Sequence, residues 1–421
     1  MRKIPVLIAA LAFVLVSWVA ADGVIYQQIT VTKLTKQQFL DLHLEPVDII
    51  EYKGDSLEII ATPENLEWLD SRGIPYQIDI PDLQAYYRSK NKDNLTMGGF
   101  KTFSEIVAHL DFLKLSYPSL MTSKFSIGTS LEGNPLWAVK VSDNPDVDEN
   151  EPEILYISLI HAREPAAGAS ILHFMEHMLS NYGLDSEVTY LVNNRELYFV
   201  PVQNPDGYLW NEATNPTGGG LWRKNRRVNP DFSRGVDLNR NYGFKWGYDN
   251  VGSSASTNSE TYRGPSAFSE PETQAYRDFV LSRNFVIIHN FHTYSNLELW
   301  SPGYDREFDP MDEFFSNVGD SLTQYNGYVP QVGWRLYPTN GAADDWCWGD
   351  TILKPRIISF TCEIGQTGFW PNPSEIPGLV AENVWPNLFL ARIAEDPYVV
   401  GPPKAPTIYE PDTTLKADDY T

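Results

Sequence analysis

Cysteine and positive charge are the two things that this sequence has little of. Its 421 residues include two cysteines, Cys347 and Cys362, which excludes a fold held together by several disulfides. For this pair the sequence leaves two alternatives, one disulfide or two buried thiols. Lysine and arginine number 32 against 55 aspartates and glutamates, so the net charge is −23 at pH 7. Such a charge argues against nucleic acid as a partner and favours the approach of cationic substrates.

A long apolar run occurs at the N-terminus. Arg2 and Lys3 precede apolar residues 6–19, and the small residues Ala20 and Ala21 follow. Residues 1–21 are therefore predicted to be a secretory signal peptide. A retained membrane anchor is the alternative, although the run is short for a span and no basic stop follows it. We expect an exported protein, secreted or periplasmic, without a membrane span after signal cleavage.

The pattern of apolar residues predicts a small unit at residues 22–90. Its strands and helices are expected in the order β-α-β-β-α-β, which is typical of a ferredoxin-like α/β domain. Residues 86–99 are polar and end in two glycines, and we place a linker at residues 91–99. Residues 396–421 form a proline-rich acidic tail that either leads to a further module or ends the chain. The expected elements lie at residues 24–31, 35–42, 48–52, 56–61, 62–69 and 76–80.

Residues 100–395 are predicted to form a larger α/β domain. Strands and helices alternate along it, which predicts a mixed, largely parallel sheet with helices on both faces. Helices are expected at residues 103–117 and 166–178, and residues 203–207 predict only a turn. Strands are expected at residues 121–127, 134–142, 154–160, 196–201, 285–294 and 357–365.

A histidine and a glutamate follow the buried strand at residues 154–160. His161 and Glu164 precede Pro165, which suits the first position of a helix. They therefore lie at the carboxyl end of a strand, where open α/β sheets bind ligands. Imidazole nitrogen and carboxylate oxygen both bind Zn²⁺. Taken alone, however, this spacing is more often a capping glutamate beside a hydrogen-bonded histidine.

Two later segments offer groups for binding and polarising a substrate. Residues 221–227 are basic, and we weigh a solvated face, a nucleic-acid surface and one arginine in a pocket that holds an oxyanion. We favour the last. Asn239 and Arg240 offer a grip for a terminal carboxylate, and Asp237 can orient a ligand histidine.

Two strands end in further candidates. His289 and His292 are three apart in a strand and face opposite sides, so only one can join a metal site, and we favour His292. His289 is expected to be a hydrogen-bonded residue. Glu363 lies toward the end of the strand at residues 357–365, where a carboxylate can exchange a proton with a metal-bound water. His173 and His177 are four apart on a helix and are weighed as a metal pair, which we disfavour.

In this order the motifs resemble the zinc metallocarboxypeptidase family, which includes pancreatic carboxypeptidases A and B and bacterial carboxypeptidase T. The likeness extends from about residue 100 to residue 394. It implies an eight-stranded sheet, one Zn²⁺ and peptide or protein substrates with a free C-terminus. The family motifs H-x-R-E, W-R-K, D-x-N-R-N, H-[ST]-Y and T-x-E fall on residues 161–164, 222–224, 237–241, 292–294 and 361–363.

Each motif implies a role by this resemblance. His161, Glu164 and His292 are the implied zinc ligands. Glu363 is the implied general base, and Arg223 the implied holder of the oxyanion. The implied substrate-binding residues are Arg163, Asn239, Arg240, Thr293 and Tyr294, and Asp237 is implied to support a ligand histidine.

The resemblance also bears on specificity. A family tyrosine that closes over substrate lies nine residues before the Trp of a D-W pair, here Asp345-Trp346, which gives Tyr337. Two residues before that Trp, this chain has Asp344, as basic-specific members do. A preference for C-terminal Lys or Arg is implied, with hydrophobic ends accepted as well.

By the same resemblance, residues 22–90 are a propeptide that covers the cleft until the linker is cut. We therefore expect a monomeric, exported zinc exopeptidase with its own propeptide as an intramolecular inhibitor. The alternatives are a zinc endopeptidase or amidase on cell-wall peptides, and a non-catalytic peptide-binding module on the same fold. Arg240 disfavours the first, because an endopeptidase has no terminal carboxylate to grip. The filled catalytic positions disfavour the second.

Overall fold

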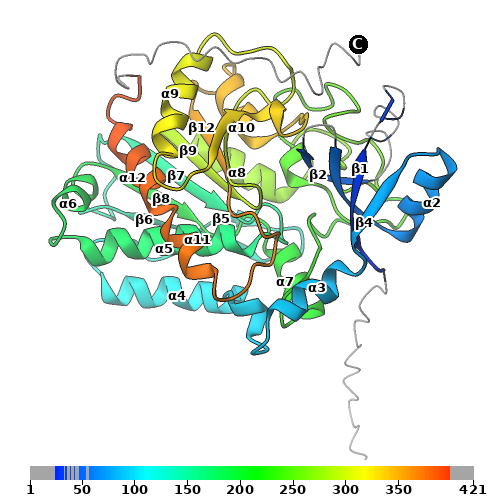
Figure 1. Ribbon diagram of the computed structural model, residues 1–421. Coiled ribbons are helices and arrows are strands. Elements are labelled where there is room, and N and C mark those ends of the chain that lie inside the picture. The colour runs from blue at the N-terminus through cyan, green and yellow to red at the C-terminus, as the bar shows by residue number, and fades with distance from the viewer. Residues whose placement is uncertain are drawn as a thin grey trace, which may run out of the picture.

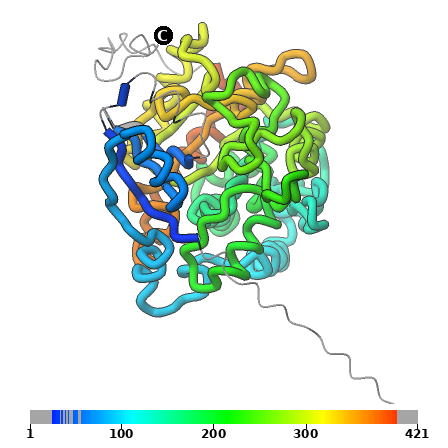
Figure 2. Tube along the Cα trace, turned by 90° about the vertical axis from the view of Figure 1, so that its right-hand side faces the viewer, coloured from blue at the N-terminus to red at the C-terminus, as the bar shows by residue number. Residues whose placement is uncertain are grey.

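The computed structural model describes residues 24–32, 34–35, 38, 42, 47–53 and 56–398. A small N-terminal unit, blue in Figures 1 and 2, packs against one side of a larger unit. The predicted signal peptide and most of the predicted helix at residues 35–42 lie outside the described residues, as does most of the predicted tail. Within the described ranges, every helix is too short or too polar to cross a membrane.

The small unit is a four-stranded antiparallel sheet with the strand order β2-β3-β1-β4, which is the order of a ferredoxin-like fold. Helix α2 (Pro63–Ser71) connects β3 to β4. It begins where the sequence predicts, because the Thr62 side chain accepts a hydrogen bond from the backbone of Asn65. The strands are β1 (Gln27–Thr32), β2 (Asp48–Lys53), β3 (Ser56–Ala61) and β4 (Tyr76–Ile80).

The connection between the two units is partly helical. The polar composition predicts a linker that begins at residue 86, but helix α3 (Leu83–Lys90) includes residues 86–90. Asp82 caps this helix, and Tyr87 is buried against the larger unit, where its hydroxyl accepts a hydrogen bond from the Phe369 amide at 3.3 Å. Residues 92–96 are exposed. They form the accessible part of the connection.

The larger unit is built on an eight-stranded sheet with the order β11-β10-β12-β9-β7-β8-β6-β5. Neighbours among the central strands β12, β9, β7 and β8 are parallel, and antiparallel pairs lie toward both edges. The predicted mixed, largely parallel sheet is confirmed. The strands are β5 (Phe125–Thr129), β6 (Pro135–Val141), β7 (Glu153–Ser158), β8 (Glu196–Val200), β9 (Phe285–His292), β10 (Leu297–Trp300), β11 (Val329–Val332) and β12 (Ile358–Glu363).

The two faces of the sheet belong to separate hydrophobic cores. Ile154 and Tyr156 of β7 enter one core, and Leu155 and Ile157 enter the other, as alternation along a strand requires. Helices α8 (Pro271–Leu281) and α10 (Ala343–Gly349) cover the second core. The first core is covered by α4 (Phe103–Ser116), α5 (Pro165–Asn181), α6 (Ser186–Val192), α7 (Pro205–Thr214), α9 (Asp312–Leu322), α11 (Ile376–Ala381) and α12 (Val384–Ile393). The predicted helices on both faces are confirmed.

Helix α7 begins inside the segment for which the sequence predicts only a turn. Asn204 accepts a hydrogen bond from the Gly207 amide at 3.0 Å, and Pro205 occupies the first helical position. The turn prediction is wrong because Asn-Pro-Asp-Gly is equally a helix start. Both cysteines are buried free thiols, which decides between the two alternatives left open by the sequence.

The chain order creates a crevice beside β7. From β7 the chain passes through α5 to β8 on one side, and it later returns to β9 on the other side. The carboxyl ends of β7 and β9 therefore flank the switch point of the sheet, where folds of this class bind ligands.

Candidate metal centre and active site

Three side chains converge at this crevice. His161 Nδ1 lies 2.9 Å from Glu164 Oε1 and 3.0 Å from His292 Nδ1, which lies 3.1 Å from Glu164 Oε2. All three side chains are buried. A tetrahedral Zn²⁺ with bonds of about 2.0–2.2 Å separates its ligand atoms by about 3.3–3.6 Å. The three distances observed between these atoms, 2.9–3.1 Å, are slightly shorter, so a small outward shift of the side chains would admit such an ion.

The donor atoms fit a cation better than a hydrogen-bonded cluster. His161 Nε2 faces Asp237 Oδ1 at 3.2 Å, so the other ring nitrogen, Nδ1, is free to act as a ligand. Two imidazole nitrogens 3.0 Å apart can share one proton only, and each of them also faces an oxygen of Glu164. One divalent cation satisfies all three side chains at once.

Asp237 couples this cluster to an arginine. Its Oδ1 also accepts a hydrogen bond from the Asn239 amide at 2.9 Å, and its Oδ2 accepts two from Arg223, at 2.9 and 3.2 Å. Burial opposes ionisation, but Arg223 and Arg240 hold the pKa of Asp237 well below its usual range. The ionised carboxylate fixes the His161 ring and the Arg223 guanidinium side by side.

Arg223 reaches the site on a loop that α7 supports. The Arg223 carbonyl accepts a hydrogen bond from the Ala162 amide at 3.0 Å. Asn204 and Asn211 donate their amides to backbone carbonyls of both loops at 2.8–3.1 Å. A Cβ at Gly207 would lie 2.6 Å from a carbonyl oxygen of the Arg223 loop, so glycine allows the close approach. Sequence reasoning missed both asparagines, although Asn204 stands at a recognisable helix cap.

Asn239 and Arg240 lie on the short turn η2 (Leu238–Arg240) next to the ligands. The Asn239 side chain accepts a hydrogen bond from the Ala343 amide at 2.9 Å. Arg240 is buried, donates to the Asn239 carbonyl at 2.8 Å and leaves its Nε–H without a partner. Its guanidinium carbon lies 5.9 Å from the centre of the Tyr337 ring. A buried guanidinium with an unused donor is suited to bind an anionic group.

Glu363 completes the cavity from the end of β12, where it pairs in register with His292. Burial raises the pKa of Glu363 to about 8; Glu164 adds to this effect, and His292 and Arg223 oppose it. A carboxyl group with a pKa close to neutrality is suited to take and return protons. Thr293, Tyr294, Leu336, Tyr337 and Phe369 line the same cavity.

Comparison with known proteins agrees with this geometry. A sequence profile described as zinc carboxypeptidase matches residues 106–385, about two thirds of the chain. The chain belongs to the zinc carboxypeptidase family. A zinc carboxypeptidase from Saccharothrix mutabilis subsp. capreolus is 32% identical over 361 residues, which cover 78% of this chain and 80% of that protein. Carboxypeptidase A2 of Mus musculus is 31% identical over 357 residues, which cover 79% and 82%.

Two solved structures share the fold. Carboxypeptidase A from Helicoverpa armigera superposes with a TM-score of 0.74 at 23% identity, covering 88% of this chain and 97% of that one. Thrombin activatable fibrinolysis inhibitor superposes with a TM-score of 0.72 at 24% identity, covering 88% and 100%. By its family match, this protein is a metallocarboxypeptidase, a hydrolase of peptide bonds.

In this carboxypeptidase, Asp344 lies at the start of α10. Its Oδ1 accepts a hydrogen bond from the Asp345 amide at 2.9 Å, and burial raises the pKa of Asp344. Asp345 is held differently, because it accepts hydrogen bonds from Ser301 Oγ at 2.6 Å and from the Gly303 amide at 2.9 Å. Asp345 therefore braces the loop after β10, whereas Asp344 is half-buried.

The N-terminal unit contacts Tyr294, which lines the cavity, and Arg163, whose guanidinium lies over the ring of the lining residue Phe369. Asp48 of β2 forms a two-pronged ion pair with Arg163, with Nη2 at 3.1 Å from Oδ1. Glu58 of β3 accepts a hydrogen bond from the Tyr294 hydroxyl. Ile49 and Ile50 of β2 join the cavity wall. The edge of the small sheet therefore covers the crevice.

The other histidines named in the sequence lie outside this centre. His173 and His177 lie on α5, where the intervening Glu176 pairs with His109 at 2.6 Å. His289 is buried and hydrogen-bonded to Asn387 and to Glu298. It is the hydrogen-bonded residue expected at that position.

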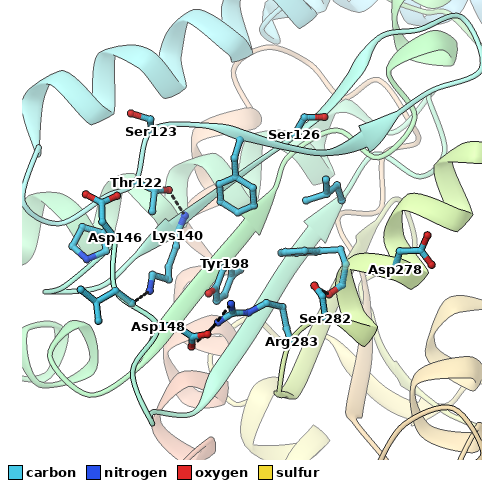
Figure 3. A pocket seen from close by; sticks show the side chains of 15 residues that line it. Thr122, Ser123, Ser126, Lys140, Asp146, Asp148, Tyr198, Asp278, Ser282 and Arg283 are labelled. Atoms are coloured by element: carbon cyan, nitrogen blue, oxygen red, sulfur yellow. Dashed lines mark hydrogen bonds and ion pairs between the residues drawn. The ribbon is translucent and has the colours of Figure 1, made fainter.

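A wider hollow of about 700 Å³ lies between β5, β6, β8 and α8 (Figure 3). Its two cations are already paired. Lys140 bonds Glu196 at 2.8 Å, and Arg283 bonds Asp148 and Glu153 at 3.0 Å. None of the residues that line it is a predicted site residue. It lies at the amino ends of the central strands, away from the crevice.

Replacing Asp237 by asparagine tests the support of the metal ligand. Asp237→Asn keeps the side chain's shape but removes the charge that fixes His161 and Arg223. Loss of such a partner is expected to weaken zinc binding about 10–100-fold, measured by competition with a chromophoric chelator. Asp345→Asn is the matched control, because Asp345 is a buried carboxylate that braces a loop. This variant is expected to keep the zinc affinity of the parent protein. Equal affinities for the two variants would contradict the role of Asp237.

Proposed function

We propose that this metallocarboxypeptidase removes single C-terminal residues with Zn²⁺ held by His161, Glu164 and His292. The observation that carries the proposal is Arg240, a buried cation whose Nε–H has no partner among the described residues. It lies 4.0 Å from the Asp237 carboxylate, which also faces His161. A free terminal carboxylate can accept the hydrogen bond that this donor does not make. An endopeptidase or amidase substrate has no such group in this place.

The side chains around the crevice have different roles in the reaction. Zinc, when bound, supplies Lewis acidity that polarises a carbonyl and favours ionisation of water. Glu363 takes the proton of the attacking water and returns it to the leaving amine. Arg223, kept in place by Asp237, donates hydrogen bonds to the carbonyl oxygen as its negative charge develops.

The C-terminal residue of the substrate is held by three groups. Arg240 and Asn239 bind the terminal carboxylate, and Tyr337 lies across the guanidinium of Arg240. This grip fixes the scissile bond near Glu363 and is the reason for cleaving one residue at a time. Thr293 and Tyr294 contribute to the wall of the same cavity.

The substrate side chain is proposed to meet Asp344. A C-terminal Lys or Arg brings a cation to this half-buried carboxylate and favours its ionised form. Ala342 and Ala343 are small and buried, so hydrophobic ends also fit. We therefore propose a preference for basic residues without exclusion of apolar ones.

The N-terminal unit is proposed to act as an inhibitory propeptide in an exported zymogen. Asp48 forms an ion pair with Arg163, and Glu58 accepts a hydrogen bond from Tyr294. The unit therefore engages two side chains that we propose bind substrate. Exposed residues 92–96, which include Lys92, are the accessible place to cut the connection. Cutting there releases β2 from the crevice.

Peptide hydrolysis tests the exopeptidase assignment. Protein cut at residues 92–96 is expected to cleave peptides ending in Lys or Arg faster than those ending in Phe, and to leave amidated peptides intact. Arg240→Ala should raise KM for the free-acid peptides roughly 10–150-fold, since a hydrogen bond to a charged group contributes about 1.5–3 kcal/mol. The control is Arg227→Ala, which removes an arginine paired with Glu270. Release from the amidated peptide at an equal rate would reject the proposal.

The covering role of the N-terminal unit is tested with the uncut chain. Asp48→Ala removes the partner of Arg163, so the uncut variant is expected to be at least 10-fold more active than the uncut parent, from a charged pair that contributes about 1.5–3 kcal/mol. Asp79→Ala, in the same unit but bonded only to Thr30 and Gln77 among the described residues, is the control. Uncut parent protein as active as the cut form would show that the unit is no inhibitor.

A further inference from the structure

We propose that this chain carries a second metal site, formed by His289, Glu298 and Cys362 and suited to Zn²⁺ or another thiolate-binding divalent cation. One ligand atom from each residue lies within 4.8 Å of those of the other two, and all three residues are fully buried. They belong to the neighbouring strands β9, β10 and β12, of which β9 and β12 lie side by side in Figure 1. The cluster is separate from the three ligands at the crevice.

Strand register places the three side chains on one face of the sheet. Glu298 and Cys362 are direct partners in the antiparallel pair β10–β12. Cys362 pairs with Phe291 in β9, two residues from His289, so His289 is its diagonal neighbour. This face belongs to the core under α12, whereas His292 and Glu363 lie at the strand ends.

The hydrogen bonds of His289 leave one ring nitrogen available as a ligand. Its Nδ1 lies 2.8 Å from Asn387 Oδ1, and the amide nitrogen of Asn387 donates to the Asn383 carbonyl at 2.9 Å. The Asn387 oxygen is therefore an acceptor, and the ring hydrogen sits on Nδ1. Metal-binding histidines are oriented in this way, with the second nitrogen donating to an oxygen. The remaining nitrogen, Nε2, faces Glu298 Oε1 at 3.0 Å.

Glu298 is a buried carboxylate with few partners that balance its negative charge. His289 is its ion-pair partner among the described residues, and its second oxygen, Oε2, makes no hydrogen bond. A neutral imidazole and a carboxylate 3.0 Å apart repel each other unless a proton or a cation lies between them. A divalent cation satisfies the imidazole nitrogen and both carboxylate oxygens.

Cys362 decides which cations fit. Thiolate, imidazole and carboxylate form a donor set typical of zinc and unlike the all-oxygen sets of magnesium and calcium. Without a metal, Cys362 Sγ donates a hydrogen bond to Asn383 Oδ1 at 3.3 Å. Without a metal, burial and the Glu298 carboxylate raise the pKa of the Cys362 thiol, so binding a cation releases that proton.

The two clusters share their construction. In each, one ring nitrogen of a histidine faces a glutamate oxygen, at 2.9 Å for His161 and 3.0 Å for His289. In each, the other ring nitrogen meets a side-chain oxygen, from Asp237 or Asn387. The second cluster adds a thiol and lacks an opening, so it is built to hold a structural ion. Such an ion would tie together the strands that end in His292 and Glu363.

Cobalt substitution separates the two sites, because only the second contains a thiolate. Full-length protein produced with Co²⁺ in the medium is expected to hold two Co²⁺ per chain and to show the near-ultraviolet thiolate-to-cobalt charge-transfer band. Cys362→Ser should abolish the band and halve the bound cobalt. Cys347→Ser, the other buried thiol, should change neither, and His292→Ala should keep the band while losing the crevice ion.

Cobalt binding by the parent protein can by itself overturn the proposal, so this test does not depend on whether a variant folds. One Co²⁺ per chain without a thiolate band would show that His289 and Glu298 form a simple buried pair. A band that survives Cys362→Ser but disappears in Cys347→Ser would place the thiolate elsewhere. Both outcomes leave the proposed exopeptidase activity untouched.

Discussion

The geometry of the crevice depends on one buried carboxylate, Asp237. It faces the His161 ring on one side and binds the Arg223 guanidinium on the other. A metal ligand and a cation are thereby held by the same ionised group, and neither can turn without disturbing the other. The fold supplies the rest, because the switch point between β7 and β9 brings His161 and His292 together from segments more than a hundred residues apart in the chain.

Charge is distributed unevenly in this protein. The chain as a whole is strongly acidic, yet the crevice collects the buried arginines Arg163, Arg223 and Arg240. Buried guanidinium groups require anions that balance their charge, and the structure provides two such carboxylates. Asp237 neutralises part of this charge permanently, and Asp48 of the N-terminal unit neutralises Arg163. The first anion belongs to the larger unit, whereas the second comes from the small N-terminal unit.

The sequence was informative where local patterns and topology agree. The central strands are short apolar runs buried on both faces, so their position and the largely parallel sheet were predictable. The ligand positions were marked because polar residues stand at the ends of those runs. Helix α7 was missed because the signal at Asn204-Pro205 is shared by turns and helix caps. Helix α3 was underestimated because Tyr87 is buried by the other unit, a contact that polarity cannot reveal. The cluster of His289, Glu298 and Cys362 depends on strand register, which no motif records.

Anomalous diffraction at the zinc absorption edge, from crystals of the protein prepared without chelator, tests the central claim most directly. The account predicts an anomalous peak in the crevice, about 2.0–2.2 Å from Nδ1 of His161, Nδ1 of His292 and a carboxylate oxygen of Glu164. A crevice without such a peak in zinc-containing protein, or a zinc ion that lacks any of these three ligands, would contradict it.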